Sequence, residues 1–136
     1  MKESLKKAVR ERARLCCEYC FAQVLFSADV FSIEHILPRI KGGLSVLYNL
    51  AFSCQCCNNH KFTATEAIDP VTGLVAQLYN PRTDTWAENF EWHENFTEII
   101  GISSSGRATV LRLDLNRIGL INLRRVLVQA GLHPPF

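Results

Sequence analysis

Two groups of three cysteines constrain the fold of this chain more than any other feature; they are Cys16, Cys17 and Cys20, then Cys54, Cys56 and Cys57. Each group contains a C-x2-C pair. A turn of this spacing can direct two thiolates at one tetrahedral ion, and two such turns complete a four-cysteine zinc site. The prediction is therefore a structural zinc ion held by Cys17, Cys20, Cys54 and Cys57. Cys16 and Cys56 would break the two-residue spacing, so we assign them to packing.

The cellular compartment of the protein decides whether its cysteines bind zinc or form disulfides. The first residues, MKESLKKAVRERARL, are charged and helical in pattern, with no apolar signal segment. No apolar stretch approaches the ~20 residues of a membrane span. We therefore expect a cytoplasmic protein without a membrane partner, where disulfides are disfavoured. Unligated buried thiols and redox chemistry stay open as alternatives to zinc.

A second feature is the segment SIEHILP, which places Glu34 beside His35 in an apolar run. One interpretation is a hydrogen-bonded core histidine next to a surface carboxylate. The other is a functional site. Neighbours on a regular strand point to opposite faces, so a shared site requires the strand to end or bulge here. The nearby Pro38 and the Gly42-Gly43 loop are compatible with that.

Together these motifs resemble the HNH endonuclease family over about residues 10–65. The family pattern runs C-x2-C, Asp/Glu-His-Ile-x-Pro, Gly-Gly, Asn-Leu, and C-x2-C-[His/Asn]-x-x-Lys. This chain matches it at Cys17 and Cys20, Glu34 to Pro38, Gly42-Gly43, Asn49-Leu50, and Cys54, Cys57, Asn58 and Lys61. Many members have Asp at the position of Glu34 and His at that of Asn58. The later segments DPVTG, NPRTDTW and GRATVLRLDLNR resemble an extension found in bacterial members.

The resemblance implies a ββα-metal fold in which two strands and a helix converge on one ion. Hydrolysis of a phosphodiester needs an activated water and a cation. His35 suits the general base, since a neutral imidazole accepts a proton near pH 7. Glu34 and Asn58 offer oxygen ligands for Mg²⁺ or Mn²⁺. Asn49 would tie the loop in place.

The function predicted is cleavage of DNA by a metal-dependent HNH endonuclease, with Arg39, Lys41 and Lys61 touching phosphate. Asn49 as a simple turn residue, Asn58 as a helix cap and Lys61 as a solvated lysine are the plainer alternatives. A zinc-stapled nucleic-acid-binding module without cleavage activity is the second functional candidate. A structural or protein-binding zinc domain is the third. Oligomeric state cannot be predicted.

Charge is distributed unevenly, although the net charge is only +2. Residues 1–14 hold six cationic side chains against two carboxylates, and residues 107–125 hold five arginines against one aspartate. Residues 82–98 hold five carboxylates against one arginine. This pattern could form a basic footprint for a polyanion, with Arg124 and Arg125 on the polar side of the last helix, or ordinary solvated faces.

The fold class predicted is α+β, as one domain of residues 1–136 with a core at about 10–65 and an extension at about 66–136. The expected elements are a helix over 2–14, two short strands within 30–40, a helix over about 57–66, hairpins turning at 70–73 and near 94–95, a helix or strand from 105, and a helix capped by Asn116 that ends at Gly131.

Overall fold

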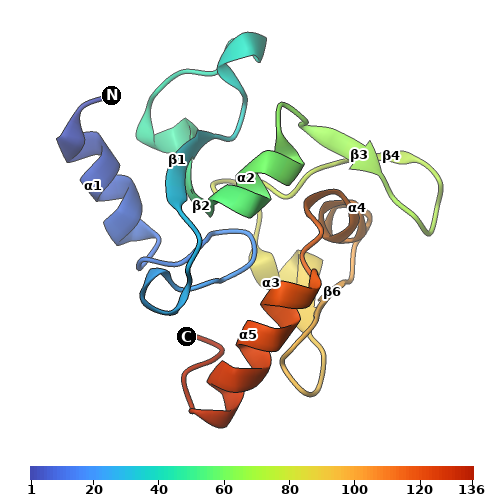
Figure 1. Cartoon of the computed structure of the whole chain (residues 1–136). Coiled ribbons are helices and arrows are strands. Elements are labelled where there is room, and N and C mark those ends of the chain that lie inside the picture. Colours follow the sequence, from blue (N-terminus) through green and yellow to red (C-terminus); the bar gives the residue numbers. More distant parts are fainter. The chain divides into compact units, whose positions relative to one another are not determined.

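The computed structural model describes residues 1–136 as a mixture of helices and two-stranded antiparallel sheets, which confirms the α+β class (Figure 1). The chain divides into two compact units. The first comprises residues 1–65 and 80–83, and the second comprises residues 66–79 and 84–136. Whether these two units fold together as one domain, as expected from the sequence, is a question of folding, so the expectation of one domain stays a prediction.

The first unit is built on one hairpin. Strand β1 (Phe31–His35) pairs antiparallel with β2 (Leu50–Cys54), in a regular register from Phe31↔Cys54 to His35↔Leu50. Helix α1 spans Glu3–Arg12 and α2 spans Gln55–Lys61; short 3₁₀ turns lie at Val24–Phe26, Arg39–Lys41 and Leu47–Asn49.

The prediction of two strands within residues 30–40 is wrong, because only β1 lies there. Residues 36–49 form the connection, and the second strand is LAFSC, in which every residue is buried. A strand covered on both faces has a continuous apolar run instead of an alternating pattern, so this strand gave no periodic signal.

The two faces of the hairpin meet different helices, as Figure 1 shows within this unit. On one face, Val9 of α1 and Ala13, which directly follows this helix, pack with Leu50 and Phe52, and Phe31 and Ile33 lie against this cluster. The other face, which carries Ser32 and Glu34, meets α2. Strand alternation therefore directs Glu34 towards α2 and His35 away from it.

The second unit has two hairpins and three helices. Its elements are β3 (Glu66–Ile68) with β4 (Val75–Gln77), α3 (Trp86–Asn89), β5 (Phe90–Trp92) with β6 (Ile99–Gly101), α4 (Ser104–Leu113) and α5 (Ile118–Gln129). Both predicted hairpins are confirmed, and so is the helical alternative for α4. Ser103 caps α4 by accepting a hydrogen bond from the Gly106 amide at 2.9 Å.

Two predictions about α5 are wrong. Its N-cap residue is Arg117, whereas the Asn116 side chain bonds both the amide and the carbonyl of Ile99. Arg124 does not lie on a polar surface: it is buried and donates to the carbonyls of Thr97 and Leu115. These backbone oxygens need donors, and a guanidinium supplies several from one side chain.

The end of α5 is as predicted, since Gly131 takes a left-handed conformation with φ of 72° directly after the last turn. No helix combines the length and the apolar character needed to cross a membrane.

Candidate metal centre and active site

The four predicted zinc ligands come together in the first unit. The sulfur atoms of Cys17, Cys20, Cys54 and Cys57 all lie within 4.8 Å of one another. The Sγ atoms of Cys20 and Cys54 are 3.7 Å apart. A tetrahedral ion with bonds of about 2.3 Å to sulfur separates its ligands by roughly 3.8 Å. The cluster therefore fits a zinc ion, and its two pairs are those expected from the spacing.

Local backbone structure positions these sulfurs. The Cys17 carbonyl accepts from the Phe21 amide at 3.0 Å, which closes the first knuckle. In the second knuckle, Cys54 ends β2 and caps α2, and its Sγ accepts from the Cys57 amide at 3.4 Å. The six cysteines form no disulfide.

The chemistry of this donor set also fits a cation. All four thiols are buried. Hydrogen bonding to Cys17, Cys20 and Cys54, together with burial, raises the pKa of the Cys57 thiol well above its ordinary value. A buried anionic sulfur is costly without a counter-charge, so four thiolates in this cluster would need a positive ion, which zinc would supply.

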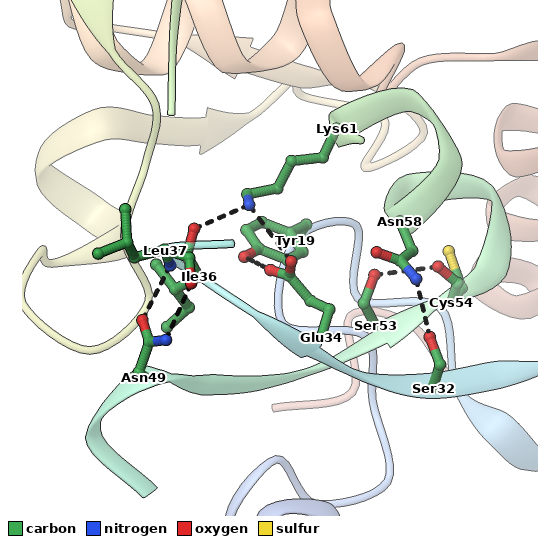
Figure 2. A network of polar contacts seen from close by, with 10 residues as sticks. All are labelled: Tyr19, Ser32, Glu34, Ile36, Leu37, Asn49, Ser53, Cys54, Asn58 and Lys61. Carbon is green, nitrogen blue, oxygen red and sulfur yellow. Dashed lines mark hydrogen bonds and ion pairs between the residues drawn. The ribbon is translucent and has the colours of Figure 1, made fainter. Parts of the chain in front are cut away.

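Glu34 lies at the centre of a polar network between the hairpin and α2 (Figure 2). Its side chain is buried, with 5% of the residue exposed. One carboxylate oxygen accepts from the Tyr19 hydroxyl, and the other accepts from Lys61 Nζ at 3.2 Å. Burial raises the pKa of Glu34, whereas Lys61 and Tyr19 oppose that shift.

Lys61 is not placed to touch phosphate. Only 2% of the residue is exposed, and its ammonium also donates to the Ile36 carbonyl at 3.0 Å. The predicted DNA contact at this position is therefore corrected: Lys61 is the internal partner of Glu34. A lysine is buried only when its charge is compensated, which Glu34 does here.

Asn58 lies on α2, one turn before Lys61. Its amide nitrogen donates to Ser32 Oγ at 3.1 Å. In Figure 2 the amide oxygen of Asn58 lies on the side towards Glu34, opposite the nitrogen that Ser32 holds. A carboxylate and an amide oxygen are ligands that Mg²⁺ and Mn²⁺ accept, so the chemistry of these two side chains fits such an ion.

His35 is half-buried at the last position of β1. Its Nε2 lies 2.8 Å from Ser45 Oγ. Burial and the positive charge of Arg39 lower the pKa of His35, which favours the neutral imidazole at pH 7. A site shared by Glu34 and His35 would require the strand to end or to bulge at this point. Strand β1 does end at His35, but its register is regular and has no bulge. Glu34 and His35 therefore leave the strand on opposite sides and do not contact each other.

Asn49 closes the connection between the strands. Its side chain accepts from the Leu37 amide at 2.8 Å and donates to the carbonyls of Leu37 and Leu44, each at 3.0 Å. Gly43 lies so close to the Leu37 carbonyl that an added Cβ would be 1.7 Å from its oxygen. This connection also carries Arg39 and Lys41, both exposed.

Three contact residues had no place in the prediction from sequence. Ser32 precedes Glu34 by two positions and so shares its face, which is a usable signal. Ser45 lies in an irregular connection and Tyr19 inside the first knuckle. Nothing in their sequence surroundings indicates that they would meet His35 and Glu34.

Comparison with known families agrees with this geometry. Residues 17–63 match the family model described as HNH endonuclease. The matched segment contains both cysteine pairs, the hairpin and α2, so the resemblance stated from the motifs is confirmed for that part of the chain. Neither the curated proteins nor the solved structures gave a match.

Proposed function

We propose that this chain, whose residues 17–63 carry the HNH endonuclease match, hydrolyses phosphodiester bonds of DNA with the help of a divalent ion. The observation that carries the proposal is that the family match and the candidate metal ligands fall in the same segment of the chain. The family match covers the hairpin and α2, and there Glu34 and Asn58 project from facing elements beside a four-cysteine cluster. We assign zinc to this cluster as a structural ion.

His35 is proposed as the general base. Its Nε2 is engaged by Ser45, so Nδ1 is the nitrogen left to accept a proton from water. That role requires Nε2 to carry the hydrogen and donate it to the serine, which fixes one tautomer. The lowered pKa of His35 favours the neutral form that can act as a base.

Glu34 and Asn58 are proposed to hold Mg²⁺ or Mn²⁺. When bound, such an ion stabilises negative charge that develops on the phosphate and the leaving oxygen. Ser32 keeps the amide nitrogen of Asn58 turned away, which leaves its oxygen for the ion. Because Glu34 and His35 leave β1 on opposite sides, the phosphate has to approach the end of the hairpin.

The connection between the strands is proposed as the part that touches DNA. Arg39 and Lys41 are exposed in the turn after Pro38, close in sequence to His35. Such side chains would bind phosphates without reading base sequence. Asn49 holds this connection in place through the Leu37 and Leu44 carbonyls.

A nucleic-acid-binding module without cleavage activity is the second candidate, and one observation favours it. Lys61 already provides a positive charge at one oxygen of Glu34, within 3.2 Å. If this ion pair replaces a metal site instead of supporting one, the chain would bind DNA and not cut it.

Conversion of supercoiled plasmid to nicked or linear forms separates the two functions. Zinc-loaded protein should cleave with Mg²⁺ or Mn²⁺, and EDTA in slight excess over the added ion should stop cleavage. His35→Ala, purified in the same way, controls for contaminating nucleases and should lose at least ~10²-fold in rate. A wild-type protein that binds DNA but never cuts it with any divalent ion would establish the binding module.

A further inference from the structure

The zinc knuckle reaches directly into the proposed catalytic site through one side chain. Tyr19 lies between Cys17 and Cys20, and its hydroxyl donates to Glu34. Figure 2 shows the tyrosine ring extending to the carboxylate, with Lys61 approaching from α2. Tyr19 and Lys61, the two side chains that contact Glu34, are both buried, with 2% of each residue exposed.

The ring of Tyr19 is held by the fold of the knuckle itself. The Cys17 amide donates to the Ala22 carbonyl at 2.9 Å, and the neighbouring Glu18 amide donates to the Phe52 carbonyl at 2.9 Å. The first bond closes the backbone loop that contains the tyrosine, and the second ties this loop to β2. A change in the knuckle, such as loss of its ion, would therefore move the hydroxyl that Glu34 accepts from.

Lys61 fixes the other side of the same carboxylate. Its ammonium bridges Glu34 and the Ile36 carbonyl, at 3.2 Å and 3.0 Å. An ionised carboxylate has about four lone-pair positions on its two oxygens, so one partner on each oxygen leaves positions for a metal. Tyr19 and Lys61 thus restrict the orientation of Glu34 without using up its capacity as a ligand.

We propose that Tyr19 and Lys61 are positioning residues that hold Glu34 for the catalytic ion, and that Tyr19 couples the zinc site to that ion. The inference rests on the proposed function. Partners that orient a ligand commonly contribute 10- to 100-fold in metal affinity. Coupling between two sites is reciprocal, so the divalent ion must in turn strengthen retention of zinc.

Tyr19→Phe removes the hydroxyl and keeps the ring. We expect it to retain zinc and cooperative unfolding, and to bind Mn²⁺ about 10- to 100-fold more weakly by calorimetry without DNA. The Mg²⁺ concentration that gives half-maximal cleavage should also be higher for this variant than for wild type. Tyr79→Phe is the matched control, because Tyr79 is also buried but belongs to the other unit. Its Mn²⁺ affinity should equal that of wild type.

Coupling is measured by titrating zinc out with a zinc-selective chelator, with and without millimolar Mg²⁺. Mg²⁺ should raise the chelator concentration needed to remove zinc from wild type, and this shift should shrink in Tyr19→Phe. Lys61→Gln should weaken Mn²⁺ binding in the same direction while zinc stays bound.

Three results would overturn the proposal. Equal Mn²⁺ affinity and an equal chelator shift for Tyr19→Phe and wild type, with wild type cleaving DNA, would refute the coupling and leave the nuclease function standing. Loss of zinc or of cooperative unfolding in Tyr19→Phe would make Tyr19 a structural residue. A wild-type protein that neither binds Mn²⁺ nor cleaves would remove the proposed function and the coupling together.

Discussion

At the scale of single residues, two serines decide how the proposed reacting groups are presented. Ser32 accepts from the Asn58 amide nitrogen at 3.1 Å, and Ser45 lies 2.8 Å from His35 Nε2. Each hydroxyl occupies one polar atom of its partner. The atom that remains, an amide oxygen in Asn58 and Nδ1 in His35, is the one that a metal ligand or a general base has to use.

Ser45→Ala should therefore slow cleavage by about tenfold, because the imidazole loses the partner that fixes its tautomer. Ser45→Thr keeps a hydroxyl and should recover most of the rate. The measurement is the cleavage rate at saturating Mg²⁺, with DNA affinity of the zinc-loaded protein without added Mg²⁺ as the control for folding. Equal rates for Ser45→Ala and wild type would show that this contact does not orient the base.

Residue types and spacing were sufficient to predict which four cysteines come together, since two C-x2-C turns determine which sulfurs can share one ion. They were not sufficient for Lys61. A lysine in the last turn of a short helix is usually solvated, and only the position of Glu34 in space provides the counterion that buries it. Arg124 is a similar case, because its carbonyl partners come from distant parts of the chain.

At the scale of elements, the hairpin β1–β2 depends on an irregular connection of residues 36–49. Asn49 bonds three backbone groups of that connection, and Gly43 lies against one of them, the Leu37 carbonyl. The motif indicated a Gly-Gly loop and an asparagine. It could not indicate the second strand, since the buried run of β2 has no alternation, and the strand was therefore misplaced.

Gly43→Ala should displace the Leu37 carbonyl, because an added Cβ would lie 1.7 Å from that oxygen. We expect at least a ~10-fold loss of cleavage with zinc retained, since the zinc cluster lies on other segments. Gly119→Ala is the control: nothing lies within 4 Å of its added Cβ, and α5 should gain about 0.5–1 kcal/mol. Unchanged cleavage by Gly43→Ala would show that the connection tolerates the shift.

In the second unit, Asp69 of the β3–β4 turn accepts two hydrogen bonds from Arg107 of α4, at 2.9 and 2.8 Å. These bonds hold the pKa of Asp69 well below its ordinary value. A carboxylate with a depressed pKa stabilises the fold above its unfolded pKa of about 3.9, and this contribution is lost as the pH falls through the folded value.

Asp69→Asn should accordingly lower the free energy of unfolding at pH 7, and its difference from wild type should shrink below about pH 4. Urea unfolding at several pH values measures this difference. Arg107→Gln should show the same convergence. A difference that stays constant down to pH 2 would mean that the ion pair is not what Asp69 contributes.

At the scale of the whole molecule, an ion held by the four-cysteine cluster would contribute to the stability of the first unit. The cluster of four cysteines joins the segment after α1 to the junction of β2 and α2, so one ion would connect elements distant in sequence. Metal binding in such a site contributes directly to folding, because the unfolded chain has no preformed site.

Cys54→Ser should lose bound zinc and the cooperative unfolding of the first unit, whereas Cys56→Ser should keep both. Cys56 is the matched control because it is a cysteine of the same segment outside the cluster. Metal analysis of the purified proteins should find about one zinc ion per chain in wild type and in Cys56→Ser. Zinc that is retained in Cys54→Ser and lost in Cys56→Ser would reverse the assignment.

The central claim, that His35 moves a proton while Glu34 and Asn58 hold a divalent ion, is tested most directly by cleavage rate against Mg²⁺ concentration. His35→Ala should fall by at least ~10²-fold at every concentration, with an unchanged midpoint. Glu34→Ala and Asn58→Ala should move the midpoint to higher Mg²⁺, and added metal should partly restore Asn58→Ala. Rescue of His35→Ala by metal, without rescue of Asn58→Ala, would contradict the account.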